Sequence, residues 1–241
     1  MQRKAQQHGK QQNRANDTST AGLGRRKKHG AAIAAGSRPP RPANARRWDL
    51  SMAIISWLGI FSGTLIWSGI NPKDSFTWGL EVAPTIIALG VMAATRRRFP
   101  LTPLLYTLVL IHSVILMIGG HYTYAEVPAF DWLAEQFHWQ RNHYDKLGHF
   151  AQGFIPAMVC RELFVRHQVI NNPKWLNSII VFICLGISAF YELIEWWVAE
   201  LSGEDAEAFL GTQGYVWDTQ SDMAMAMIGA IVALLCLSRL H

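Results

Sequence analysis

The second half of this 241-residue chain contains three pairs of ionisable side chains whose spacing could build one chemical site. In each pair the two residues are three or four positions apart, so on a helix they lie on the same face. The pairs are Asp145 with His149, Glu192 with Glu195, and Asp218 with Asp222. Neighbouring carboxylates repel each other unless a proton, a basic side chain or a cation neutralises them. Because imidazole nitrogens and carboxylate oxygens suit Zn²⁺ or Mn²⁺, the spacing indicates a divalent-metal site formed by these residues, with Lys146 as the local alternative to a metal.

The same residues could take part in catalysis. His149, Glu192 and Asp222 are the candidate catalytic groups, with His149 or a glutamate as general base, or with a metal-bound water as nucleophile. Six polar residues near the ends of apolar segments are candidates for contacts with a substrate: Glu81, His121, Tyr124, Glu126, Lys146 and Gln220. Alternatively, all of these groups only form interhelical hydrogen bonds and ion pairs that hold a bundle together. His112, isolated inside an apolar segment, is better explained as a hydrogen-bonded packing residue than as a ligand.

The elements that must position these groups are apolar segments long enough to cross a membrane. Hydrophobic residues make up 50% of the chain and charged residues only 16%, whereas about 25% is usual in a soluble domain. Six apolar segments lie near residues 50–70, 77–95, 101–120, 149–167, 176–198 and 220–239. As a helix, each would span a hydrocarbon core of about 30 Å. The sequence therefore predicts an all-α, polytopic membrane helical bundle of about six transmembrane helices, formed by residues 49–241.

Residues 1–48 differ from the rest of the chain in composition and charge. They contain 12 Lys and Arg residues, a single acid (Asp17) and almost no aromatic side chains. Such a segment buries too little apolar surface to offset its conformational entropy, so we expect a disordered tail. Its basic cluster at 25–28 could attract anionic lipid headgroups or nucleic acid, but it is better explained as a charge that keeps the tail in the cytoplasm. No specific nucleic-acid partner is expected.

Charge also predicts how the bundle is oriented. Segments rich in Lys and Arg alternate along the chain with neutral or acidic segments, as six crossings require. The loop at 96–98 is basic, for example, whereas the loop at 199–219 contains acids and no Lys or Arg. Both termini are therefore expected in the cytoplasm, and the polar groups described above at the outer membrane face. Residues 128–140 could form either a short helix on that outer surface or a plain loop.

Four segments carry a resemblance to a known family. They are HYTYAEVP at 121–128, RNHYDKLGHFAQGF at 141–154, YELIEWW at 191–197 and GTQGYVWDTQSDM at 211–223. Through these segments the chain, from about residue 49 to its C-terminus, resembles the YjdF-type family of inner-membrane proteins. The resemblance implies a multi-pass protein of the bacterial inner (cytoplasmic) membrane, in contact with the lipid bilayer, and it implies no particular activity.

The chain is more loosely similar to VanZ-like membrane proteins. Their pattern is Asp-Lys-x-x-His-Phe, then a helix with a glutamate, then paired aspartates that enter a last helix. The matching residues are Asp145, Lys146, His149 and Phe150, then Glu192 or Glu195, then Asp218 and Asp222. One turn after the last Asp, where that pattern has an Asn, this chain has Ala226, so the similarity does not imply an identical ligand set. It implies a small helical domain with an outward-facing polar site.

Three functions are compatible with these features. The leading hypothesis is an outward-facing site that binds or processes a cell-envelope or lipid-linked molecule, either as a binding protein or as an enzyme. The second is a proton- or ion-coupled transporter, against which stand the position of the polar groups at one face and the lack of an evident inverted repeat. The third is a structural or assembly protein without catalysis. The divalent metal is the only cofactor that the residue pattern suggests.

Overall fold

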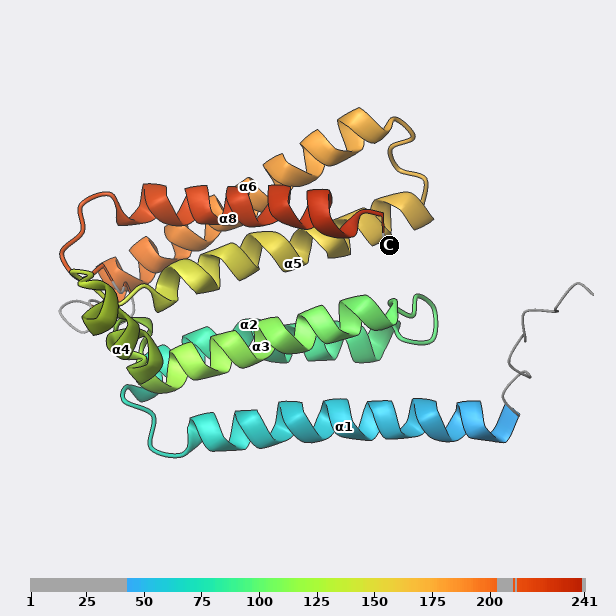
Figure 1. Cartoon of the computed structure of the whole chain (residues 1–241), viewed down its shortest axis with the longest axis horizontal. Helices are drawn as coiled ribbons and strands as arrows, with labels where there is room; N and C mark the ends of the chain where they lie inside the picture. Colours follow the sequence, from blue (N-terminus) through green and yellow to red (C-terminus); the bar gives the residue numbers. More distant parts are fainter. Residues whose placement is uncertain (1–42, 203–209, 211, 240–241) are drawn as a thin grey trace, which may run out of the picture. The chain divides into compact units, whose positions relative to one another are not determined.

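The computed structural model describes residues 43–202, 210 and 212–239 (Figure 1). In this part of the chain every regular element is helical, which confirms the predicted all-α class. The elements are α1 (Ala43–Gly69), α2 (Ser75–Thr95), α3 (Pro103–Tyr122), the 3₁₀-helix η1 (Tyr124–Glu126), α4 (Pro128–Phe137), α5 (Tyr144–Arg166), α6 (Pro173–Ser202) and α8 (Asp218–Leu237). Residues 1–42 of the predicted tail lie outside the described residues, and α1 begins at Ala43, before the predicted boundary at 49.

Five helices in the described part of the chain are long and apolar enough to cross a membrane. They are α1, α2, α3, α6 and α8, and they coincide with five of the six predicted segments. The sixth predicted segment, 149–167, overlaps α5 up to Arg166, and this helix has the length for a crossing but carries more charged residues. Because α5 packs against α3, α6 and α8, its polar side chains can face protein rather than lipid. A polytopic helical membrane protein is therefore confirmed, and the crossing by α5 stays a prediction.

Local sequence explains where several helices begin. Three of them have a proline as their first residue: Pro103 in α3, Pro128 in α4 and Pro173 in α6. At this position the fixed φ of proline favours the helix and its missing N–H group costs no hydrogen bond.

The residues at 128–137 form the short helix that was one of two alternatives for this segment. α5 begins at Tyr144, five residues before the predicted start, so Asp145 and Lys146 lie in its first turn.

The helices α5 and α8 lie side by side (Figure 1) and approach each other closely. A Cβ atom at Gly153 in α5 would overlap the carbonyl oxygen of Ala226 in α8, and a Cβ at Gly229 would overlap the carbonyl oxygen of Phe150. Small residues at both positions let the two backbones touch, as is common between membrane helices. This contact fixes the start of α8, with its two aspartates, beside the first turns of α5.

The two ends of the bundle differ in character. At the end away from α4, apolar residues of α3, α5, α6 and α8 form a buried core: Leu105, Ala157, Met158, Leu176, Ile180, Cys184, Ala230, Ala233 and Leu234. The opposite end carries α4 together with the start of α5, the end of α6 and the start of α8 (Figure 1). All three predicted pairs of ionisable residues lie at this second end.

Candidate functional site

His149, on the second turn of α5, lies among carboxylates from three helices. Its Nε2 atom is 3.4 Å from Asp145 Oδ1, 3.8 Å from Glu192 Oε1 and 3.9 Å from Asp222 Oδ1. All four residues are buried. We call Asp145, His149, Glu192 and Asp222 the His149 cluster. It unites one complete predicted pair with one member of each of the other two pairs.

The second imidazole nitrogen of His149 is held by Gln152. Nδ1 lies 3.1 Å from Gln152 Oε1, one turn further along α5. Because an amide oxygen only accepts hydrogen bonds, Nδ1 carries the proton in this pairing, and Nε2 is the ring nitrogen that faces the carboxylates. Hydrogen bonds of this kind orient histidine ligands in metal sites. His149 therefore has the surroundings of a metal ligand.

Beside the His149 cluster, two basic side chains neutralise two aspartates. Lys146 Nζ is 2.7 Å from Asp218 Oδ1 and 2.5 Å from Asp222 Oδ1, and Arg141 Nη2 is 2.6 Å from Asp218 Oδ1. The ring of Tyr215 lies over both cations, 5.0 Å from Arg141 and 5.9 Å from Lys146. Asp218 is thus paired with two basic side chains, whereas Asp222 lies between Lys146 and the other residues of the His149 cluster. Asp218 is therefore the least available of the predicted metal ligands.

Carboxylates outnumber basic side chains at this end of the bundle. Arg141 and Lys146 lie among six buried carboxylates, those of Glu81, Asp145, Glu192, Glu195, Asp218 and Asp222. Among the described residues, Glu192 Oε1 has no hydrogen-bond partner and is shielded from solvent. Because uncompensated buried charge is costly, the surplus requires protons or a bound cation. The ligand atoms of Asp145, His149 and Asp222 lie within 4.8 Å of one another, close enough to surround a single ion.

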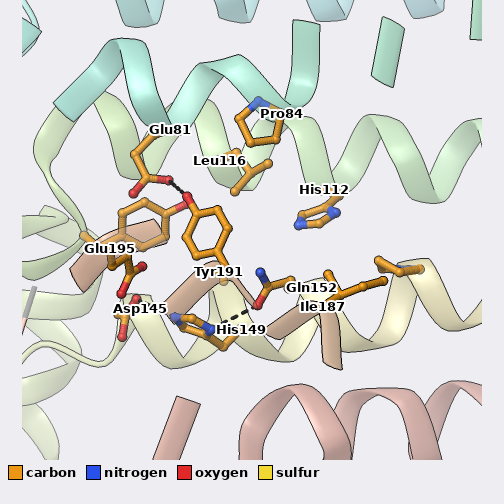
Figure 2. Close-up of a pocket in the computed structure, with 13 residues that line it drawn as sticks. Glu81, Pro84, His112, Leu116, Asp145, His149, Gln152, Ile187, Tyr191 and Glu195 are labelled. Carbon is orange, nitrogen blue, oxygen red and sulfur yellow. Dashed lines mark hydrogen bonds and ion pairs between the residues drawn. The ribbon is translucent and has the colours of Figure 1, made fainter. Parts of the chain in front are cut away.

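A cavity of about 200 Å³ adjoins the His149 cluster (Figure 2). It lies between α2, α3, α5 and α6, and its lining residues are Glu81, Pro84, His112, Leu116, Tyr124, Asp145, Gly148, His149, Gln152, Pro156, Ile187, Tyr191 and Glu195. Ligand pockets for drug-sized molecules typically measure about 300–1,000 Å³. The cavity therefore suits a small molecule or one end of a larger molecule.

Tyr124 lines this cavity near Glu81. Its ring fits against two helices that lack side chains at the contact, since a Cβ at Gly119 in α3 or at Gly148 in α5 would overlap the ring. Thr123, which precedes it, has φ of 58°, a rare conformation for a β-branched residue that turns the chain from α3 into η1. Burial, together with the neighbouring Glu81, raises the pKa of the Tyr124 hydroxyl, which therefore stays protonated and able to donate.

Three of the predicted substrate contacts lie away from the cavity. His121 Nδ1 is 3.0 Å from the carbonyl oxygen of Ser68, which places this ring between α3 and α1. Glu126 forms an ion pair with Lys73 at the surface, and Gln220 is exposed on α8. Of the other three, Glu81 and Tyr124 line the cavity and Lys146 pairs with the aspartates.

His112 differs from its predicted role. Its ring lines the cavity, and its Nε2 atom is shielded from solvent without a hydrogen-bond partner in the described part of the chain. The prediction of a hydrogen-bonded packing residue is therefore wrong for this atom. The sequence carried one signal, a single histidine inside an apolar segment, but it did not show that the ring faces a cavity.

Several residues that organise the site were not among the predicted ones. The Tyr191 hydroxyl donates to Glu81 Oε2 at 3.2 Å. The backbone N–H of Asn142 donates to Gln213 Oε1 at 3.0 Å, and Gln213 Nε2 donates to the Asn142 carbonyl at 2.9 Å. These two bonds join the loop before α5 to the loop before α8, beside Arg141 and Asp218. Such contacts depend on the shapes of two loops, which residue spacing does not reveal.

Comparisons with known proteins agree with this fold. A family model described as "Predicted membrane protein (DUF2238)" matches residues 53–241, which include all four sequence segments quoted above. The chain belongs to this family. It is also 51% identical over 177 residues to the inner membrane protein YjdF of Escherichia coli (strain K12), an alignment that covers 73% of this chain and 85% of that protein. No solved structure matches the chain.

Family membership and the apolar helices together define the cellular location. The chain is a multi-pass protein of the inner membrane, in contact with the lipid bilayer, as predicted. The name of the relative gives a location and no activity. The similarity to VanZ-like proteins stays a prediction.

Proposed function

We propose that this membrane protein binds or processes a cell-envelope or lipid-linked molecule at an outward-facing site, with the help of a divalent cation held by the His149 cluster. The observation that carries the proposal is the convergence of Asp145, His149 and Asp222 within 4.8 Å. Glu192 supports it, because its unpartnered Oε1 lies 3.8 Å from His149 Nε2. This donor set of one imidazole and several carboxylates suits Zn²⁺ or Mn²⁺.

The residues of the His149 cluster have distinct roles under this proposal. Asp145, His149 and Asp222 would hold the cation, which would polarise a bound oxygen atom of the substrate or a water molecule. Glu192 lies next to this position, and its Oε1 atom has no hydrogen-bond partner in the described part of the chain. Its negative charge would strengthen cation binding, and it would accept a proton if the site is catalytic. Lys146 would fix the position of Asp222, to which it is paired at 2.5 Å.

A transporter is less well supported than a binding protein or enzyme. The end of the bundle opposite the His149 cluster is filled by the buried apolar core that includes Met158, Ile180 and Ala230. Glu162, a buried carboxylate at that end, is paired with Arg166 at 2.7 Å and does not extend a polar path from the cavity. A coupled carrier would need such a path to reach the cytoplasm.

Metal analysis of purified protein tests the proposal. Wild-type protein loaded with Zn²⁺ or Mn²⁺ and then desalted should retain about one ion per chain, since the candidate ligands converge on one position. Glu192→Gln and Asp222→Asn should each lower the retained metal, whereas Glu135→Gln, an exposed acid on α4, should not. Wild-type protein that retains no metal under any loading condition would overturn the cation-dependent site.

A flux assay separates the proposal from a transporter, and the stability of the variants separates it from a structural role. Sealed liposomes that contain the protein should take up no Zn²⁺ or Mn²⁺ beyond protein-free liposomes, whereas uptake that is lost in Asp222→Asn would favour a transporter. If Glu192→Gln and Asp222→Asn unfold the protein and wild type retains no metal, the structural alternative is favoured instead.

A further inference from the structure

The cavity has two chemically different ends. At one end, which we call the carboxylate end, lie Glu81, Asp145 and Glu195 together with the rings of Tyr124 and Tyr191. At the other, the His112 end, lie apolar side chains and His112 itself (Figure 2). The lining residues in the described part of the chain include no Lys or Arg. The carboxylate end therefore favours a cation. The two tyrosine rings also favour an ammonium group, because cations are attracted to the faces of aromatic rings.

The length of the cavity follows from its helices. On α3, His112 lies eight residues from Gly120, which is next to Glu81, and on α6, Ile187 lies eight residues from Glu195. Eight residues of α-helix correspond to a rise of about 12 Å. Two helices therefore give the same separation between the carboxylate end and the His112 end.

The His112 end is apolar but not free of polar groups. Leu116, Ile187 and the two prolines inside helices, Pro84 and Pro156, supply apolar lining. The lining also includes the polar Gln152, whose Oε1 faces His149, and His112, whose Nε2 is shielded from solvent and has no hydrogen-bond partner among the described residues. Leaving a buried nitrogen unpaired is costly, so an occupant with a hydrogen-bonding group at this depth would be stabilised.

We propose that the cavity binds the amine-bearing end of an amphiphilic molecule, with its ammonium group against Glu81 and Glu195 and an uncharged hydrogen-bonding group against His112. The proposal rests on the proposed function, since it names the class of molecule that the site would take. A cation held by the His149 cluster would engage Asp145 and leave Glu81 and Glu195 to the amine. The methylene groups between the two polar ends would contact Leu116, Pro84 and Ile187.

Titration calorimetry with three matched probes tests this inference. The full chain is used in uncharged maltoside micelles that contain EDTA, and micelles without protein give the background. The probes are 8-amino-1-octanol, which has both polar groups roughly 12 Å apart, octylamine, which lacks the hydroxyl, and 1,8-octanediol, which lacks the amine. The amino alcohol should bind about tenfold or more tightly than the diol, because it adds a charged hydrogen bond, and roughly two- to tenfold more tightly than octylamine.

Variants assign each preference to its residue. Glu195→Gln should remove the preference for amines, and His112→Leu should remove the preference for the hydroxyl while His112→Gln retains it. Glu135→Gln should change neither preference. Equal binding of the diol and the amino alcohol to wild type would overturn the proposal, as would no binding of any probe or a hydroxyl preference that survives in His112→Leu.

The metal analysis keeps the two proposals separate. Protein that retains no metal but shows both probe preferences would overturn the cation site and support the amine-binding cavity. Protein that retains one ion but shows no amine preference would do the reverse.

Discussion

At the scale of single residues, the two aspartates of one predicted pair have different surroundings. Asp218 and Asp222 are one turn apart on α8. Asp218 accepts hydrogen bonds from Arg141 and Lys146, whereas Asp222 Oδ1 lies between Lys146 at 2.5 Å and His149 at 3.9 Å. Asp218 therefore anchors the loop and the helix start, and Asp222 belongs to the His149 cluster.

Asp218→Asn should destabilise the protein while leaving its metal content intact. Without this carboxylate, Arg141 loses its acidic partner and Lys146 loses one of its partners. Removing one member of a buried pair costs about 3–5 kcal/mol, and we expect the lower part of that range because both basic side chains keep slight exposure. Thermal unfolding and metal analysis of the purified variant check this. An unchanged melting temperature, or loss of metal without loss of stability, would contradict it.

Residue spacing located the His149 cluster because helical periodicity is a local property. Residues four apart share a face whatever the rest of the fold does, so Asp145 and His149 could be paired from sequence. Spacing does not give the rotation of a helix about its axis, however. It could not predict that Glu192 faces His149 while Glu195 lines the cavity. The partners Arg141, Tyr191 and Gln213 were missed because each contact joins parts of the chain far apart in sequence.

At the scale of elements, α5 was the helix whose limits were hardest to predict. A search for apolar residues places its start at 149, after the polar first turn. In the structure the Asn142 side chain accepts a hydrogen bond from the backbone N–H of Tyr144 at 2.9 Å, which helps to start the helix earlier. The apolar helices were easier, because a run of about 20 apolar residues has few alternatives to a membrane span.

The contact between α5 and α8 gives a prediction for two glycines. Gly153→Ala and Gly229→Ala should each force the helices apart, because the added methyl group meets a backbone oxygen that cannot rotate away. Overpacking of this kind costs about 1–3 kcal/mol. Separation would also move Asp222 away from His149, so the retained metal should fall together with the melting temperature.

Gly59→Ala in α1 is the matched control for this prediction. A Cβ at Gly59 meets nothing within 4 Å, so the change should be neutral or stabilise the helix by up to about 1 kcal/mol. If Gly153→Ala and Gly59→Ala unfold at the same temperature and retain the same metal, the close contact between α5 and α8 does not position the site.

At the scale of the whole molecule, the bundle has a polar end and an apolar end. The His149 cluster and the cavity lie at the end that carries α4, while the buried core that includes Leu105 and Cys184 fills the other. Five of the six predicted spans could be read from composition alone. The role of α5 could not, because a central helix lined with charges resembles a soluble helix until its neighbours α3, α6 and α8 are known.

Labelling of single cysteines tests the six-span arrangement and the crossing by α5. In a background in which Cys160, Cys184 and Cys236 are replaced by alanine, Gln136→Cys lies before α5 and Asn171→Cys lies after it, and both positions are exposed. If α5 crosses and the N-terminal tail is cytoplasmic, a membrane-impermeant maleimide should label Gln136→Cys in intact spheroplasts, and Asn171→Cys only after lysis. Labelling of both positions before lysis would show that α5 does not cross. The reverse pattern would place the His149 cluster on the cytoplasmic side and would contradict the proposed outward-facing site.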